Sequence, residues 1–116
     1  MLNVGVDIVA INRIDSILSS KKEDRFLDKI FSQKEIEESK GKTNKSQYFS
    51  GRFAAKEAIK KALSSYDKTA ETSFKSIEVL NSDSGKPYVI SRSNEDISIS
   101  ISHDGNYAVA FCVIDR

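Results

Sequence analysis

A helical repeat that includes Gly51 constrains this 116-residue chain more than any other feature. The sequence GRFAAKEAIKK at residues 51–61 places apolar side chains at helical spacing, so they form one stripe suited to burial. We expect the helix to start just after a polar loop at residues 41–46, which puts Gly51 inside it. A glycine there costs roughly 1 kcal/mol relative to alanine, and it indicates close packing against another backbone. The stripe consists of Phe53, Ala54, Ala58, Ile59, Ala62 and Leu63.

Glu57 stands at the border of this stripe, among several cations. Lys60 and Lys61 follow it by three and four residues, so we expect them on the same side of the helix. A charged substrate could then meet all three side chains, with Arg52 and Lys56 flanking the same stripe. The alternative is a solvated helix face with ordinary salt bridges, each worth roughly 0.2 to 0.5 kcal/mol.

A second carboxylate, Asp7, interrupts an apolar run near the N-terminus. Strand alternation assigns the run to two faces, with Val4, Val6, Ile8 and Ala10 on the main apolar face and Gly5, Asp7, Val9 and Ile11 on the other. A carboxylate removed from water needs a cation, a hydrogen-bond donor or a metal ion as its partner. Asp7 is therefore a candidate metal ligand, or alternatively a cap or a member of a salt bridge. Gly5 leaves room for another group to approach the backbone.

Length and composition limit the classes of protein. We expect one domain over residues 1–116. The net charge of +1 argues against a protein that coats nucleic acid, and no apolar segment is long enough to span a membrane. The single Cys112 excludes an intramolecular disulfide, and with no signal-like N-terminus it indicates a cytoplasmic protein. Because His103 is the only histidine, any metal must be held by oxygen ligands, and two carboxylates favour Mg²⁺.

The first half of the chain has the period of helices after its opening strand. Asn12 can cap a helix that continues to Leu18, and an amphipathic element follows at residues 26–31. Ser32 and Glu35 form a plausible capping box for a further helix that ends near Gly41. The long helix comes next.

The second half changes to the period of strands. Extended runs at residues 77–79 and 87–90 surround a turn at 81–86, and runs at 97–101 and 107–113 surround a three-residue loop at 104–106. This order of elements predicts an α+β fold, in which an antiparallel sheet accompanies a long central helix and smaller helices.

His103 closes the run at 97–101, so alternation points it toward the apolar side, where it is either a satisfied structural histidine or a binding residue. Ser102 and Asp104 point to the opposite face, which argues against a hydrolase triad. The chain also has neither GxGxxG nor GxxxxGK[ST]. Any phosphate must therefore be bound by side-chain cations and isolated backbone amides.

Four motifs, taken in order, resemble those of a known enzyme family. GVDIV at 5–9 is followed by Arg13, and GRFAAKEA lies at 51–58, SGKP at 84–87 and ISH at 101–103. Together they resemble holo-[acyl-carrier-protein] synthase, the small single-domain class of 4′-phosphopantetheinyl transferases, over essentially the whole chain. The resemblance implies Mg²⁺-dependent transfer of the 4′-phosphopantetheine arm from coenzyme A to a serine of apo acyl carrier protein. It also implies release of adenosine 3′,5′-bisphosphate, and a homotrimer with active sites at subunit interfaces.

The resemblance also implies roles for single residues. Asp7 and Glu57 would bind the metal and act in catalysis with Lys61, and Arg13 would contact the carrier protein. The residues implied for coenzyme A are Arg52, Lys61, Lys86 and His103, the last across a subunit interface. Ala10 and Ser84 depart from the commonest family pattern, which affects carrier contact and turn geometry but not the metal pair.

The chemistry of the residues agrees with these roles, because attack on a pyrophosphate needs cations that offset charge repulsion and stabilise the leaving group. Either Glu57 or a metal-bound water would accept the serine proton, and the water is favoured because a carboxylate bound to Mg²⁺ is less basic. Two other functions stay open. One is a non-catalytic binding module in which Asp7 and Glu57 form structural ion pairs, and the other is a metal-dependent phosphohydrolase.

Overall fold

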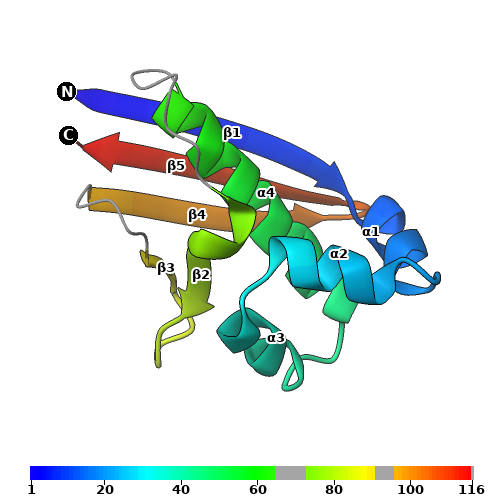
Figure 1. The fold of residues 1–116 in the computed structure, drawn as a ribbon. Coiled ribbons are helices and arrows are strands. Elements are labelled where there is room, and N and C mark those ends of the chain that lie inside the picture. Colours follow the sequence, from blue (N-terminus) through cyan, green and yellow to red (C-terminus); the bar gives the residue numbers. More distant parts are fainter. Residues whose placement is uncertain (65–72, 91–95, 116) are drawn as a thin grey trace.

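A long helix crosses one face of a three-stranded antiparallel sheet in the computed structural model (Figure 1). The structure describes residues 1–64, 73–90 and 96–115. Its elements, in chain order, are β1 (Leu2–Ala10), α1 (Ile11–Leu18), α2 (Glu23–Ile30), α3 (Gln33–Ser39), α4 (Lys45–Ser64), the 3₁₀ turn η1 (Phe74–Ser76), β2 (Glu78–Asn81), β3 (Pro87–Ile90), β4 (Asp96–Asp104) and β5 (Tyr107–Asp115). The α+β class with a long helix is confirmed.

The strands form two sheets rather than the single sheet that we expected. The larger has the order β1-β5-β4, and the β2-β3 hairpin lies beside β4 (Figure 1). Asp104 pairs with Tyr107, so only Gly105 and Asn106 form the turn between β4 and β5. The prediction of a three-residue loop was wrong by one residue. Gly105 has a φ of +57°, which suits the tight turns that join two antiparallel strands.

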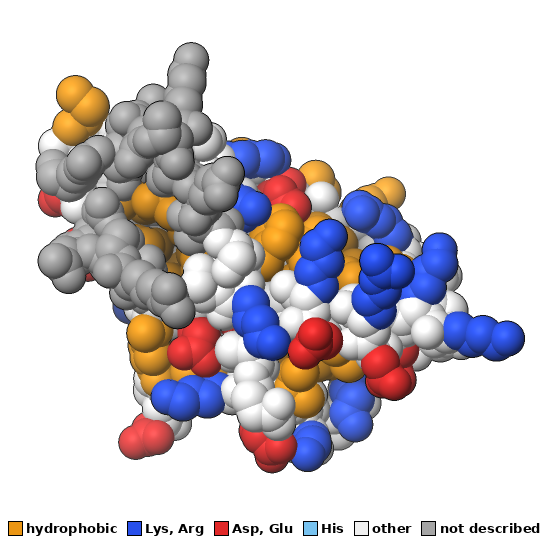
Figure 2. Space-filling model, in the orientation of Figure 1, with side chains coloured by type: hydrophobic (Ala, Val, Ile, Leu, Met, Phe, Trp, Pro, Cys, Tyr) orange, Lys and Arg blue, Asp and Glu red, His pale blue; other side chains and the backbone are white. Residues whose placement is uncertain are grey.

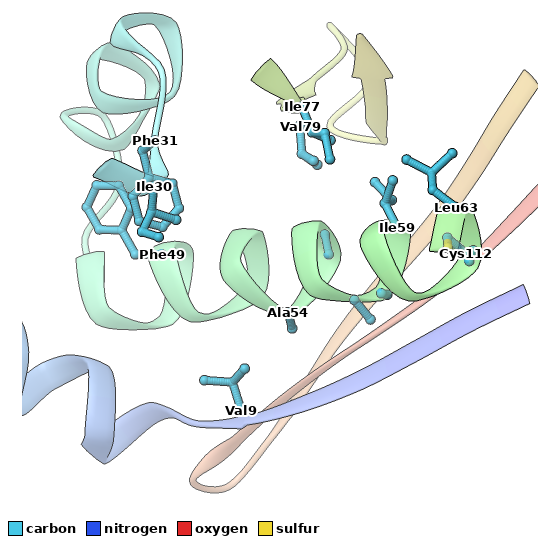
Figure 3. Close-up of a cluster of buried hydrophobic side chains, with 14 of the residues drawn as sticks. Val9, Ile30, Phe31, Phe49, Ala54, Ile59, Leu63, Ile77, Val79 and Cys112 are labelled. Atoms are coloured by element: carbon cyan, nitrogen blue, oxygen red, sulfur yellow. The ribbon is translucent and has the colours of Figure 1, made fainter. Parts of the chain in front are cut away.

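Helix α4 lies between two layers, so it is buried on two sides and not only along the single apolar stripe that the sequence predicted. Figure 3 shows Phe31, Phe49 and Val79 on one side of the helix and Val9 of β1 on the other. Arg52 and Lys56, predicted to flank a single stripe, are buried, because α3 and β2 cover the side of α4 away from the main sheet. The small side chains that let β1 and β5 approach the helix are Ala54, Ala55, Ala58 and Ala62.

The inner face of β1 is the one that carries Asp7. Gly5 and Val9 are buried, whereas Val4, Val6 and Ile8 remain exposed by 54–63%. The main apolar face of the strand therefore points away from this chain's core. Gly5 explains the choice, because a Cβ at this position would overlap the Ala58 carbonyl of α4. The space that Gly5 leaves open is used by the helix backbone.

The predicted N-terminal caps of α3 and α1 have different outcomes. The capping box of α3 is confirmed, because the Glu35 backbone N–H donates to Ser32 Oγ and the Ser32 N–H donates to Glu35 Oε1. Asn12, however, does not cap α1. Its backbone N–H donates to Oδ1 of Asn106, which lies in the β4–β5 turn, so a distant side chain performs the capping. Among the described residues, no helix is both long and apolar enough to cross a membrane.

Candidate active site

Asp7 of β1 and Lys61 of α4 meet at the edge of the helix–sheet interface. The Lys61 ammonium donates to Asp7 Oδ1 over 2.8 Å and to the Val6 carbonyl over 3.1 Å. The Asp7 side chain is 17% exposed, and that of Lys61 is 55% exposed. The hydrogen bond to Asp7 raises the pKa of Lys61, and the negative charges of Asp7 and Glu57 act in the same direction. The lysine therefore stays protonated beside two carboxylates.

Glu57 is half-buried and lies one helical turn before Lys61 on α4. Glu57 and Lys61 leave α4 one helical turn apart and Lys61 contacts Asp7, so Lys61 connects the two acidic residues. Lys60 does not join them, because its ammonium lies 3.9 Å from the centroid of the Phe74 ring. At about 100° per residue, Lys60 and Lys61 leave the helix on opposite sides of Glu57, and only Lys61 points toward β1.

Asp7 and Glu57 supply oxygen donors of the kind that Mg²⁺ prefers. An ammonium already takes the cation position at Asp7 Oδ1, which shows that this oxygen is presented to a positive charge. In the described ranges no group of three or more His, Cys, Asp or Glu side chains is suited to hold a metal. A pair of carboxylates is the donor set expected for Mg²⁺, which keeps several waters and completes its shell with substrate phosphates.

A hollow of about 280 Å³ lies toward the other end of α4, and it contains Arg52 and His103. His103 Nε2 is 3.2 Å from the Gln47 carbonyl oxygen, and the ring packs against Gly51. Gly51 therefore makes room for the side chains of His103 and Ile101, and not for another backbone as we expected. The residues that line the hollow are Lys42, Thr43, Asn44, Gln47, Tyr48, Arg52, Asn81 and His103. Helical and strand periodicity did not indicate most of these lining residues.

The guanidinium of Arg52 is held in the wall of this hollow. It donates through Nε to the Val79 carbonyl and through Nη2 to Glu38 and Asn81. The same group lies 4.5 Å from the centroid of the Tyr48 ring. Sequence reasoning missed Glu38 and Asn81 because their contacts with Arg52 join segments far apart in the chain.

A fully buried ion pair supports α4 from the side of α3. Lys56 Nζ is 2.6 Å from Glu35 Oε1, and both side chains are 0% exposed. The ammonium also donates to the carbonyls of Ile30 and Phe74, and the second carboxylate oxygen accepts from the Val79 N–H. Burial lowers the pKa of Lys56, and the Glu35 charge opposes this effect. The capping box was the one sequence signal that pointed to Glu35.

Lys86 and Arg13 lie apart from both groups. Lys86 is exposed in the β2–β3 turn and lines another hollow with Pro87 and Ile97, among other residues. Within one chain, Lys86 and Arg52 therefore line different hollows. Arg13 is exposed in the first turn of α1, beside the buried Ile14. Figure 2 shows Lys and Arg side chains gathered at the α1–α2 end of the molecule, with acidic side chains among them.

Comparison with known proteins places this geometry in a family. The sequence profile of the 4'-phosphopantetheinyl transferase superfamily matches residues 3–112. The chain therefore belongs to this superfamily, a class of transferase enzymes. It is 47% identical over 112 residues to the holo-[acyl-carrier-protein] synthase of Thermodesulfovibrio yellowstonii, with 96% of each chain covered.

Solved structures show the same fold. A holo-(acyl-carrier-protein) synthase from Bacillus anthracis in complex with CoA (3′,5′-ADP) is similar with a TM-score of 0.82 and 38% identity, covering 97% of this chain and 94% of that one. The Helicobacter pylori holo-[acyl-carrier-protein] synthase in complex with coenzyme A has a TM-score of 0.82 and 33% identity, covering 97% and 99%. The resemblance seen in the motifs is confirmed over nearly the full chain.

Proposed function

We propose that this protein transfers the 4′-phosphopantetheine arm of coenzyme A to a serine of an apo acyl carrier protein and releases adenosine 3′,5′-bisphosphate. The observation that carries the proposal is the meeting of Asp7, Glu57 and Lys61, from β1 and α4. The identity to holo-[acyl-carrier-protein] synthases supports the substrate pair, and the bound coenzyme A of the related structures supports the donor.

Asp7 and Glu57 would hold the Mg²⁺ ion, whose chemistry when bound is to polarise the pyrophosphate and stabilise the leaving group. Lys61 carries a fixed positive charge next to both carboxylates, and it would neutralise a phosphate oxygen that approaches them. Of this chain's own side chains, Glu57 is the candidate to accept the serine proton, and a water molecule is the favoured alternative because a carboxylate that holds Mg²⁺ is less basic. The fixed strand and helix hold these groups in register.

The hollow around Arg52 and His103 would bind other phosphate groups of coenzyme A. Arg52 and Lys61 are nine residues apart, so at about 100° per residue they leave α4 from opposite sides. One coenzyme A molecule therefore fits poorly across both groups of a single chain. This supports a site shared between subunits, in which one subunit supplies the Asp7 group and its neighbour supplies Arg52 and His103.

The outer face of the sheet supports a homotrimer. Val6 and Phe111 are paired across β1 and β5, and they are exposed by 54% and 46%. Contiguous apolar faces of this kind mark interaction sites in soluble proteins. The other large apolar side chains exposed on this face are Leu2, Val4, Ile8, Tyr107 and Val109. A second and third copy would cover them.

Arg13 and the cations near it would dock the acyl carrier protein, which is expected to be acidic. A cytoplasmic location fits the free thiol of Cys112, which is buried and whose pKa is raised by burial to about 11. Such a thiol stays reduced and unreactive.

A mass measurement tests the function. The protein is incubated with coenzyme A, Mg²⁺ and an apo acyl carrier protein, and the carrier should gain roughly 340 Da, the mass of the transferred arm. The control carrier has its acceptor serine replaced by alanine and should gain nothing. If no carrier gains mass while phosphate is released from coenzyme A in the carrier's absence, a phosphohydrolase is the better description.

Light scattering tests the assembly. The chain should elute with three times its monomer mass of 12.9 kDa, and Val6→Lys should shift it to the monomer. Gln33→Lys is the control, because it adds the same charge at an exposed position of α3, away from the sheet. A wild-type monomer at micromolar concentration would contradict the trimer.

A further inference from the structure

Helix α3 is joined to α4 and β2 by two similar sets of contacts. In each set a carboxylate of α3 binds a cation of α4 and also accepts a backbone N–H of β2. The inner set consists of Glu35, Lys56 and Val79, and the outer set of Glu38, Arg52 and Asn81. The pair formed by Glu35 and Lys56 is 0% exposed, whereas the Glu38 side chain is 21% exposed and Arg52 lines the hollow. Only the outer set has access to a ligand.

Glu38 uses both of its carboxylate oxygens on residues of the hollow wall. Oε1 accepts from the Tyr48 hydroxyl over 2.6 Å and from Arg52 Nη2 over 3.1 Å. Oε2 accepts the Asn81 backbone N–H over 2.9 Å. Tyr48, Arg52 and Asn81 all line the hollow. One carboxylate thus fixes three of its lining residues relative to one another.

The contacts of Arg52 leave a defined part of its guanidinium for a ligand. The group has five N–H donors. Nε binds the Val79 carbonyl over 3.1 Å, and Nη2 binds Glu38 and also Asn81 Oδ1 over 2.7 Å. Among the described residues none is recorded as accepting from Nη1, and the ring of Tyr48 fixes the plane of the group. The guanidinium is held along its Nε–Nη2 edge, which leaves the two N–H donors of Nη1 for a ligand.

We propose that Glu38 is a positioning residue for coenzyme A, because it holds Arg52 so that the Nη1 donors face the hollow. This inference rests on the proposed function. Glu38 itself is not among the residues that line the hollow. Its effect comes from pre-organisation, since a long arginine side chain fixed before binding loses less entropy when a phosphate arrives.

The direction in which coenzyme A affinity changes when Glu38 loses its charge distinguishes positioning of Arg52 from competition for Arg52. If Glu38 only competed with a phosphate for the charge of Arg52, removal of its charge would strengthen coenzyme A binding. If Glu38 positions Arg52, removal weakens binding. Glu38→Gln is suited to the question, because an amide keeps the size of the carboxylate but must point its NH₂ at either the Arg52 or the Asn81 donor.

The experiment is titration calorimetry of coenzyme A with the wild type, Glu38→Gln, Arg52→Ala and the double variant. We expect Glu38→Gln to weaken binding about tenfold, and to have no further effect when Arg52 is already alanine. Glu37→Gln is the matched control, since Glu37 is the preceding residue of α3, pairs with Lys40 and should leave affinity unchanged.

The measured affinities test whether Glu38 positions Arg52. Unchanged or tighter binding by Glu38→Gln would overturn the positioning role, as would an equal loss in the Arg52→Ala background. If Glu38→Gln does not fold, Glu38→Asp replaces it, because it keeps the charge and shortens the reach, and the same tenfold loss is expected. A wild-type protein that binds no coenzyme A would instead refute the proposed function, and this inference with it.

Discussion

The Lys61 ammonium lies 2.8 Å from Asp7 Oδ1, and this contact joins the opening strand to the long helix at the candidate active site. Glu57 lies one helical turn before Lys61, and its negative charge acts on the same ammonium. Changes to these three side chains, or to the packing that holds them, should therefore alter activity.

Glu57→Gln should fold normally, bind coenzyme A and lose transfer by at least about 100-fold in kcat, since it removes a proposed metal ligand at the reacting phosphate. Carrier mass gain measures the rate, and thermal unfolding measures the fold. Glu37→Gln is the control, because this carboxylate lies on α3, is 57% exposed and pairs with Lys40 of the same helix. A variant that unfolds, and loses activity for that reason, would favour the binding module with structural ion pairs.

Gly5→Ala should destabilise the protein by about 1 to 3 kcal/mol, the usual cost of overpacking, because the added Cβ meets the Ala58 carbonyl oxygen. Movement of α4 away from β1 should also separate Glu57 and Lys61 from Asp7 and lower kcat. Urea unfolding and the carrier assay measure the two effects. Gly41→Ala adds a methyl group whose nearest neighbour among the described residues, the Glu38 carbonyl oxygen, is 3.8 Å away, so the stability of this variant should stay within about 0.5 kcal/mol of wild type.

Lys56→Met should cost about 3 to 5 kcal/mol of unfolding free energy, because it leaves the Glu35 carboxylate buried without its cation. Lys60→Met on the same helix removes a contact with the Phe74 ring and should cost less than about 1 kcal/mol. Chemical denaturation of both variants gives the comparison. Similar losses for the two lysines would show that the buried pair has no special structural weight.

The acid limb of the stability curve should depend on Glu38. Burial acts to raise its pKa, but hydrogen bonds from Tyr48, Asn81 and Arg52 hold it below the ordinary value of 4.5. A carboxylate with a depressed pKa in the folded state contributes stability above pH 4.5, and this contribution disappears as the pH falls through the folded-state pKa. Glu38→Gln should therefore be less stable at pH 7 and lose less stability on acidification. An unchanged slope below pH 4.5 would contradict this account.

Mixed trimers should reveal whether the site is shared. Asp7→Ala and His103→Ala should each be inactive alone, and subunit exchange between them should restore part of the activity, because some interfaces would then combine two intact halves. Native mass spectrometry confirms that mixed trimers form. Mixed trimers without activity would argue that each chain holds a complete site.

Much of the candidate site could be predicted from short-range pattern. Glu57 and Lys61 are one helical turn apart in any α-helix, and strand alternation alone puts Asp7 opposite Val6 and Ile8. The α4 helix, the four strands of the two hairpins and the capping box of α3 were likewise local features, and the structure has them. Residue spacing could not show which segment packs against each face of β1 and α4.

Tertiary packing decided those partners. Alternation gives a strand two faces but does not choose between them, and the choice in β1 fell to Gly5 because only a glycine admits the α4 backbone. Lys56 and Arg52 look like solvated cations until α3 supplies Glu35 and Glu38 from 21 and 14 residues away. The sequence by itself determined which residues carry charge and at what helical or strand phase. The folded chain determined which charges are buried, since burial depends on contacts between segments that no local period records.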